Sequence, residues 1–249
     1  MTTRMSINFL SSLLNNKVVS IVGPAKYMTD SGLGEEIDKS DTIVRINRSY
    51  ESIEKYSQDI GSKTDILYSC LIEKPANAGI LDIDVFKNNG IKYICAPPAS
   101  DMKGMSNATR LHNLIDVEKV TKISNEIPVR VVDHEFHNQL AKAVQCRPNT
   151  GFMAIYDLLR FQPKLLKIYG FSFYLDGFIK GVKEGIKEEQ NKTQEEFTIQ
   201  CFNSKRHIQK NMWEFAKSTL LNNENVYVDN TLMEILNMKS LNRDDFEKR

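Results

Sequence analysis

The chain has 249 residues, of which 41% are hydrophobic and 26% charged, as is usual for a globular protein with its own core. Its 33 basic and 32 acidic residues give a net charge of +1, which excludes strong electrostatic attraction to nucleic acid or to an anionic membrane surface. No apolar run approaches the roughly 20 residues that span a bilayer, and residues 1–17 lack a secretory pattern. We therefore expect a cytoplasmic protein without a nucleic-acid partner.

The predicted elements alternate between helices and strands. Residues 1–16 space their apolar side chains as an amphipathic helix does. Short apolar, β-branched runs follow at residues 18–22, 42–46, 65–68, 92–95, 129–132, 165–169 and 225–228. Helical periodicity lies between most of them, at residues 107–124, 135–144, 150–161 and 207–221. Continuous apolar strands separated by helices predict an α/β fold with a mainly parallel sheet of about seven strands, covered on both faces.

The whole chain, residues 1–249, is expected to form a single doubly wound, Rossmann-like domain. It has no internal repeat and no low-complexity linker, and the charged residues 241–249 are expected to fray. Residues 97–104 contain two prolines and a glycine and predict a loop after a strand. Residues 177–198 are rich in Lys, Glu and Gln, a composition typical of a solvated helix or a mobile loop, which can act as a lid beside a site.

The sequence does not predict a metal site. The four cysteines lack metal-ligand spacing, and Cys70 and Cys95 suit reduced, buried thiols. Asp82-Ile83-Asp84 matches a loose metal-binding signature, but it stands at the start of a helical segment. Acidic side chains are favoured there by the helix dipole, so we interpret these aspartates as a helix start.

Residues 18–47 read as a buried strand, a glycine turn, a short helix and a second buried strand. Gly23, directly after the first strand, lets the backbone approach a ligand closely, and Pro24 stiffens the turn. Arg45 and Asn47 end the second strand and offer a charge and an amide to a ribose, base or carboxylate. Alternatively, Arg45 pairs with a nearby aspartate as structural support. Polar residues beyond the carboxyl ends of adjacent strands are how open α/β sheets build nucleotide sites.

A predicted helix N-terminus forms the second candidate site. Asn149 or Thr150 can cap the helix that starts at residue 150, with Gly151 in its first turn. Free N–H groups at a helix N-terminus also bind phosphate or carboxylate. The same residues can therefore cap the helix and bind an anion.

A glycine, a hydroxyl and a phenol follow the strand at residues 165–169. They are Gly170, Ser172 and Tyr174, and they are expected at the carboxyl edge of the sheet. Tyr174 suits either a position in the core or a ligand contact.

Of the four histidines, His112, His134 and His137 read as surface or helix-end residues. His207 differs because it stands at a loop-to-helix junction. An imidazole, whose unperturbed pKa is ~6.5, suits a general base at neutral pH.

Taken in order, these motifs resemble those of the animal-type sialyltransferase family and its microbial relatives. The large motif of that family is matched by Val22-Gly23, Gly32 and Gly34, Ile37-Asp38, and Val44-Arg45-Ile46-Asn47. The small motif is matched by Pro148-Asn149-Thr150-Gly151, followed by Tyr169-Gly170-Phe171. A later motif supplies His207 with Glu214 downstream. The resemblance therefore extends over nearly the whole domain.

The resemblance implies a glycosyltransferase with a type A-like variant of the Rossmann-like fold. It would move sialic acid, or a related ulosonic acid, from a CMP-sugar donor to a glycan hydroxyl, with inversion and without a metal or other cofactor. His207 would take the acceptor proton, and Tyr174, with Arg206 and the backbone of Thr150 and Gly151, would stabilise the phosphate. The donor-binding residues implied are Gly23, Pro24, Ala25, Arg45, Asn47, Asn149, Thr150, Gly151, Gly170, Phe171 and Ser172. Peripheral membrane association follows if the acceptor is a glycolipid.

The chain departs from the animal pattern in three places. Pro24-Ala25 stands where the animal enzymes have Asn-Ser, so one donor contact is lost or replaced. The positions of their disulfide hold no cysteine here. A further phosphate-contacting histidine is not evident, and Tyr174 or a residue of segment 177–198 can take its place.

Three alternatives remain open from the sequence. They are a CMP-Kdo-type transferase on the same site, a CMP-sugar hydrolase in which His207 activates water, and a non-catalytic nucleotide-binding module. The loops at residues 97–107 and 177–203 are expected to decide the choice of acceptor.

Overall fold

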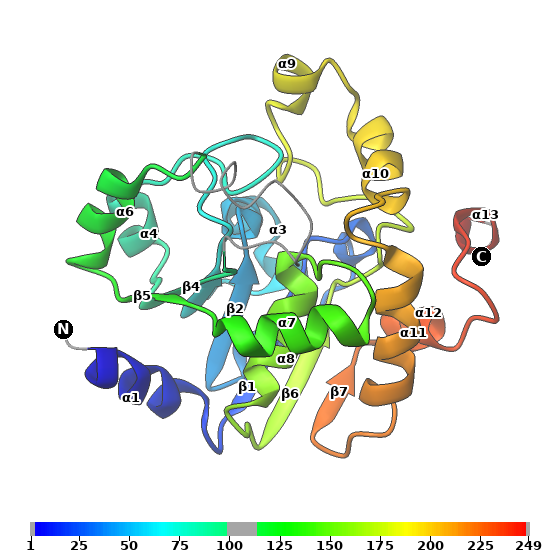
Figure 1. The fold of residues 1–249 in the computed structure, drawn as a ribbon. Helices are drawn as coiled ribbons and strands as arrows, with labels where there is room; N and C mark the ends of the chain where they lie inside the picture. Colours follow the sequence, from blue (N-terminus) through cyan, green and yellow to red (C-terminus); the bar gives the residue numbers. More distant parts are fainter. Residues whose placement is uncertain (1–2, 99–113, 248–249) are drawn as a thin grey trace.

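A single seven-stranded sheet forms the centre of the protein (Figure 1). The structure is a computed structural model that describes residues 3–98 and 114–247. The strands are β1 (Val18–Val22), β2 (Thr42–Ile46), β3 (Ile66–Tyr68), β4 (Tyr93–Ala96), β5 (Val129–Val131), β6 (Leu165–Tyr169) and β7 (Val226–Val228). Their order is β5-β4-β3-β2-β1-β6-β7, and all neighbouring pairs are parallel. The predicted α/β fold is confirmed, and β1, β2 and β6 have the predicted bounds.

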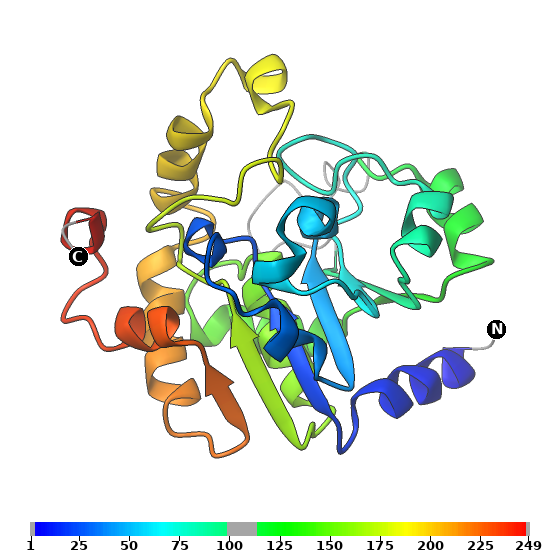
Figure 2. The ribbon, with the colours of Figure 1, turned by 180° about the vertical axis from the view of Figure 1, so that it is seen from behind.

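Helices cover both faces of the sheet (Figures 1 and 2). One face carries α1 (Thr3–Leu14), α7 (His134–Ala143), α8 (Thr150–Leu159) and α11 (Gln209–Leu220), with α12 (Asn230–Leu236) beside α11. The other face carries η1 (Lys26–Met28), α2 (Gly34–Asp38), η2 (Ser49–Ser52), α3 (Ile53–Ile60), α4 (Ile83–Asn88) and α6 (Val117–Ser124). This two-faced covering explains the strand composition, because a strand buried on both sides has no polar face.

Successive side chains of the central strands pack into hydrophobic clusters on opposite faces of the sheet. Val19 and Ile21 of β1 pack in the cluster that holds α8 and α11, whereas Val22 packs with Ile37 and Ile60 on the opposite face. All five residues of β2 are buried. The alternation follows from the two-residue period of a strand, and it decides below where a charged strand residue lies.

The chain reverses its direction across the sheet between β1 and β6. From β1 the strands run outward to β5 on one side, and β6 and β7 then add to the other side of β1. The crevice beyond the carboxyl ends of β1 and β6 is therefore the topological switch point, where open α/β sheets bind ligands.

Two glycines allow the backbones to approach at this switch point. The N–H of Gly23 donates to Tyr169 O at 2.8 Å. A Cβ on Gly23 would lie 2.3 Å from Gly170 O, and a Cβ on Gly170 would lie 2.4 Å from Gly23 O. Gly170 also has a positive φ of 73°, which L side chains rarely adopt. Only glycine fits either position.

Side-chain carboxylates and amides cap the helices as the sequence suggested. Asp82 accepts hydrogen bonds from the N–H groups of Asp84 and Val85 at the start of α4, so its helix-start interpretation is confirmed. Asn149 accepts from the N–H of Phe152 at 2.8 Å and caps α8. Of the two capping candidates for α8, the structure therefore selects the asparagine.

All four cysteines are free thiols. Cys95 is buried, as expected, and burial raises the pKa of its thiol to about 12. Cys70 is half-buried. One histidine differs from its prediction: His137 is 1% exposed within α7, because its side of that helix packs inward with Leu140 and Ala141.

Residues 177–202 cover the carboxyl end of the sheet instead of forming a wholly solvated segment (Figures 1 and 2). They include α9 (Ile186–Gln190) and α10 (Gln194–Phe202). Backbone bonds tie them to the turn after β1, since Ile179 N donates to Pro24 O at 2.9 Å. Five of their apolar side chains are buried: Phe178, Ile179, Val182, Ile186 and Phe197. The composition of the segment does not predict this anchoring, because its polar residues outnumber the buried apolar ones.

Both ends of the described chain are helical. The predicted amphipathic helix is α1, whose Leu10 and Leu14 are fully buried. The tail that was expected to fray contains α13 (Arg243–Glu247), and Arg243 contacts Glu195 of α10. No helix in residues 3–98 or 114–247 is long and apolar enough to cross a bilayer. Residues 99–107 of the loop predicted at residues 97–107, and His112, lie outside the described residues.

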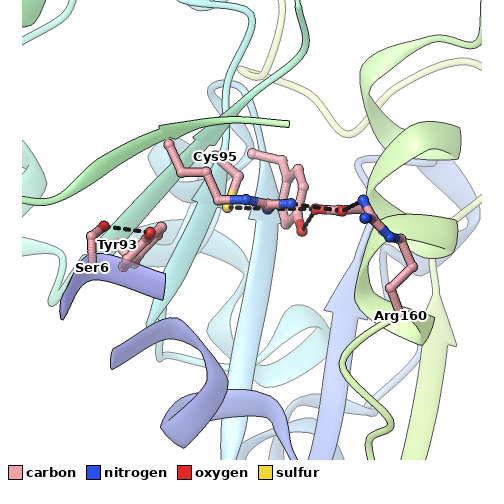
Figure 3. A network of polar contacts seen from close by, with 7 residues as sticks. Ser6, Tyr93, Cys95 and Arg160 are labelled. Atoms are coloured by element: carbon pink, nitrogen blue, oxygen red, sulfur yellow. Dashed lines mark hydrogen bonds and ion pairs between the residues drawn. The ribbon is translucent and has the colours of Figure 1, made fainter. Parts of the chain in front are cut away.

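A polar network lies inside the sheet-and-helix core (Figure 3). Asp157 of α8 is fully buried, and Arg130 of β5 donates to both of its oxygens, at 2.7 and 2.9 Å. Tyr68 and Arg160 donate to the same carboxylate, at 2.7 and 3.2 Å. The network joins α8 to β3 and β5 across the face on which α8 lies.

Candidate active site

A cavity of about 420 Å³ opens at the switch point, within the size range of small-molecule sites. The turns after β1, β2, β3 and β6, the N-terminus of α8, the loop before α11 and residues 177–201 all line it. It brings together most of the predicted site residues: Pro24, Ala25, Asn47, Asn149, Thr150, Gly151, Gly170, Phe171, Ser172, Tyr174, Arg206 and His207. Gly23 lies just behind, where it permits the close backbone approach described above.

Arg45 does not reach this cavity. It is fully buried on the face of β2 that it shares with Ile43, beneath the end of α3. Its Nη2 donates to Ile60 O and Gly61 O at 2.8 and 2.9 Å, and its Nε donates to Lys63 O at 3.1 Å. Backbone carbonyls thus hold the Nη2 and Nε donors of the guanidinium away from the cavity. The predicted donor contact is wrong for this residue, which instead supports the turn between α3 and β3.

Asn47 is fixed at the end of β2 by its backbone and side chain. Its φ is 50°, in the left-handed region that asparagine tolerates better than most residues. Its N–H donates to Tyr68 O at 2.7 Å, and its Oδ1 accepts from Cys70 N at 3.0 Å. Because the amide oxygen is engaged, its NH₂ group is the part that can donate to a ligand.

The N-terminus of α8 presents backbone donors to the cavity. Among the described residues, no protein acceptor takes the N–H groups of Thr150 and Gly151. A Cβ on Gly151 would lie 2.9 Å from the Phe171 ring, so glycine keeps this turn close to the β6 turn. The helix dipole adds partial positive charge at the same place. This arrangement suits an anionic ligand.

His207 is held by a backbone carbonyl. Its Nδ1 lies 2.8 Å from Arg147 O, and a carbonyl can only accept, so Nδ1 carries the hydrogen in the neutral ring. This tautomer leaves Nε2 with a lone pair. The N–H of Arg147 in turn donates to Arg206 O at 3.1 Å, which ties the His207 loop to the segment that precedes α8. The imidazole therefore lines the cavity close to the segment that precedes α8.

Tyr174 occupies a tight turn after β6. Phe173 and Tyr174 both have positive φ, 52° and 61°, a strained conformation for aromatic residues. The Tyr174 ring packs edge-on against Phe178 at 5.5 Å between centroids. Burial, with a smaller contribution from Cys201, raises the pKa of Tyr174. Its phenol therefore stays protonated at neutral pH and can donate a hydrogen bond.

Sequence reasoning missed the residues that hold the β6 turn in place. Tyr27 of η1 donates to Asp229 Oδ2 at 2.8 Å and accepts from Phe171 N at 3.0 Å. Asp229 also accepts from Gly170 N at 2.9 Å, and Asp176 accepts from Tyr27 N at 2.6 Å. An aspartate between a strand and a helix signals the cap that Asp229 forms on α12. No local signal connects it with Tyr27.

Glu214, matched to the late motif by resemblance, lies on the exposed side of α11, 3.9 Å from Lys210 and outside the lining of the cavity. Among the described residues, no three His, Cys, Asp or Glu side chains cluster in a way that could hold a metal ion.

We expect Tyr27→Phe to lower the free energy of unfolding by about 1–3 kcal/mol, because Phe171 N and a buried carboxylate each lose a partner. Urea unfolding measures this change. The matched control is Tyr227→Phe, at a tyrosine that is 36% exposed, where the change should stay within about 0.5 kcal/mol. Equal stability of the two variants would contradict the role given to Tyr27.

A cavity at the switch point of a parallel sheet, lined by a helix N-terminus and a positioned imidazole, is typical of enzymes that act on nucleotide-linked substrates. The family model of glycosyltransferase family 29 (sialyltransferase) matches residues 15–176. This match spans more than half of the chain, which belongs to glycosyltransferase family 29, the sialyltransferases.

Solved structures of sialyltransferases share the fold. A mammalian sialyltransferase in complex with Gal-beta-1-3GalNAc-ortho-nitrophenol is 16% identical, with a TM-score of 0.52 over 92% of this chain and 79% of that chain. CstII from Campylobacter jejuni, in complex with the substrate analogue CMP-3FNeuAc, is 13% identical, with a TM-score of 0.54 over 85% and 81%. The monofunctional alpha-2,3-sialyltransferase Cst-I from Campylobacter jejuni is 12% identical, with a TM-score of 0.53 over 92% and 82%. No curated protein matches the chain.

Proposed function

We propose that this enzyme transfers sialic acid, or a closely related ulosonic acid, from a CMP-sugar to a hydroxyl group of a glycan. The proposal rests first on His207, whose Nδ1 bond to Arg147 O at 2.8 Å leaves Nε2 as a base in the cavity. Membership of the sialyltransferase family supports the donor class. The cytidine and ribose are assigned to the turns after β1 and β2, around Pro24 and Asn47.

In the proposed reaction, Nε2 of His207 accepts the proton of the acceptor hydroxyl as that oxygen attacks carbon 2 of the sugar acid. The bond between carbon 2 and the phosphate oxygen breaks, and its electron pair leaves with CMP. Attack opposite to the leaving group inverts the anomeric carbon. A proton thus moves from acceptor to histidine, and the new glycosidic bond replaces the bond to phosphate.

Charge that develops on the departing phosphate needs donors fixed before the reaction. The N–H groups of Thr150 and Gly151, the neutral phenol of Tyr174 and the Arg206 side chain are the candidates, because all four residues line the same cavity. This set would stabilise the leaving group without a divalent cation.

The proposal is tested by incubating the protein with CMP-Neu5Ac, with and without lactose, and measuring free CMP. We expect CMP release only when an acceptor is present, at a rate that EDTA does not change. Release of CMP without an acceptor would identify a hydrolase. If the protein does not bind CMP at all, it is neither a transferase of this kind nor a nucleotide-binding module. A loss of activity in EDTA would reject the metal-independent mechanism. Faster release from CMP-Kdo would assign the other sugar acid.

A further inference from the structure

A lysine from the covering segment lines the same cavity as Tyr174 and the α8 N-terminus. Lys183 donates from Nζ to Ala76 O, in the loop after β3, at 2.7 Å. Its Nζ also lies 5.5 Å from the ring centroid of Phe178 and 5.9 Å from that of Phe197. Two aromatic rings and a carbonyl thus fix the ammonium in one place.

Among the described residues, no carboxylate lies within ion-pair distance of the Lys183 ammonium. The acidic group that influences it, Glu51, already accepts from Nε and Nη2 of Arg48 at 2.9 and 2.6 Å. Two thiols adjoin the lysine, Cys70 and Cys201, and burial raises the pKa of both, that of Cys201 to about 11. They are neutral at physiological pH. Enclosed charges in proteins are normally paired with an opposite charge. The Lys183 ammonium can therefore pair with an anionic ligand in the cavity.

Lys183 and Tyr174 share one side of the cavity. The Phe178 ring contacts both of them, since its centroid lies 5.5 Å from that of Tyr174 and 5.5 Å from the lysine Nζ. The Cys201 thiol lies near both the Tyr174 phenol and the Lys183 ammonium. An anion that accepts from the Tyr174 phenol therefore lies in the field of the ammonium.

We propose that Lys183 binds the phosphate of the CMP-linked donor and supplies the positive charge opposite the leaving group. The inference rests on the proposed function, because it names a binding residue for that donor. One of the three ammonium donors is used by Ala76 O, which leaves two for phosphate oxygens. Lysine serves such sites as a point charge.

The ionisation of Lys183 gives the site a pH dependence. Burial is the main cause that lowers the pKa of Lys183 to about 8, and Arg48 lowers it further, whereas Glu51 opposes the shift. A bound phosphate favours the charged form, so the pKa rises in the complex. Affinity for the phosphate should therefore fall as the pH rises above about 8.

The test compares CMP with cytidine, which lacks the phosphate, by calorimetry on the full chain. We expect Lys183→Met to weaken CMP binding about 10- to 100-fold while cytidine binding stays unchanged. The matched control is Lys180→Met, at an exposed lysine of the same segment that does not line the cavity, which should bind both ligands as the unmodified protein does. Lys183→Arg, which keeps the charge, should recover part of the loss.

The unmodified protein provides a test that needs no folded variant. Its ratio of CMP to cytidine affinity should fall as the pH is raised from 7.5 to 9.5, across the pKa of about 8. A constant ratio, equal CMP affinity in Lys183→Met, or an equal loss of CMP and cytidine binding would overturn the assignment of the phosphate to Lys183. Failure of the unmodified protein to bind CMP at all would instead reject the proposed function itself.

Discussion

Replacing His207 by asparagine is expected to lower kcat for transfer by about 10²- to 10⁴-fold and to leave the affinity for CMP unchanged. The asparagine side-chain NH₂ group can still donate to Arg147 O, the partner of Nδ1 in the structure, so the loop before α11 keeps its anchor. The amide has no basic nitrogen, so the acceptor proton loses its destination. Steady-state CMP release with a saturating acceptor measures kcat, and calorimetry measures the affinity for CMP.

The control for this prediction is His134→Ala, at an exposed histidine that begins α7, and it should keep full activity. A fully active His207→Asn variant would show that the base lies elsewhere. Loss of CMP binding together with activity would mean that His207 organises the donor site and is not only the base.

Replacing Asp157 by alanine is expected to lower the free energy of unfolding by about 3–5 kcal/mol. Asp157 is fully buried, and the Arg130 side chain that pairs with it is 10% exposed. Removing the carboxylate leaves the guanidinium buried without its counter-charge and takes a hydrogen-bond acceptor from Tyr68. Equilibrium unfolding in urea, followed by far-ultraviolet circular dichroism, measures the loss.

A double variant separates the cost of an unpaired charge from the value of the pair. Asp157→Leu combined with Arg130→Met removes both charges and should be less destabilised than Asp157→Ala alone. Glu118→Ala serves as the surface control, because its pair with Lys122 is 81% and 73% exposed and contributes only about 0.3–0.5 kcal/mol. If Asp157→Ala and Glu118→Ala lose equal stability, the core network does not carry the energy assigned to it.

The fold could be predicted to a large extent, because the burial of a strand can be read from the residues of that strand alone. The runs that became β1, β2 and β6 are mainly apolar, and the residue that follows each of them is a glycine or an asparagine, which favour a turn. Parallel pairing follows once helices separate such strands. The edge strand β5 is partly exposed, and there the predicted end was one residue too late.

Arg45 illustrates what the local pattern leaves undetermined. Its position near the end of β2 predicts a place at the carboxyl edge, but a strand residue faces one side of the sheet or the other. Arg45 faces the side on which α3 ends, and three backbone carbonyls of residues 60–63 accept from its Nε and Nη2. Asn47 is only two residues later, yet it lies beyond the strand and lines the cavity.

The position of segment 177–202 could not be predicted from its amino-acid composition. Its many charged residues predict a solvated segment, but the buried side chains of Phe178, Val182 and Phe197 fix it over the sheet. This anchoring is what places Lys183 in the cavity. Average polarity cannot show it, because a few apolar side chains at suitable spacing are enough to bury one face of a segment.

The sequence by itself determined the parallel α/β fold, the glycine turns, the helix N-terminus and the candidate base, because each depends on neighbouring residues or on strand and helix periodicity. Only the tertiary structure decided which polar groups share the cavity. Contacts such as Tyr27 with Asp229, His207 with Arg147 and Lys183 with Ala76 join residues 202, 60 and 107 positions apart. Such pairs are set by how the strands and helices pack, and no local pattern records that packing.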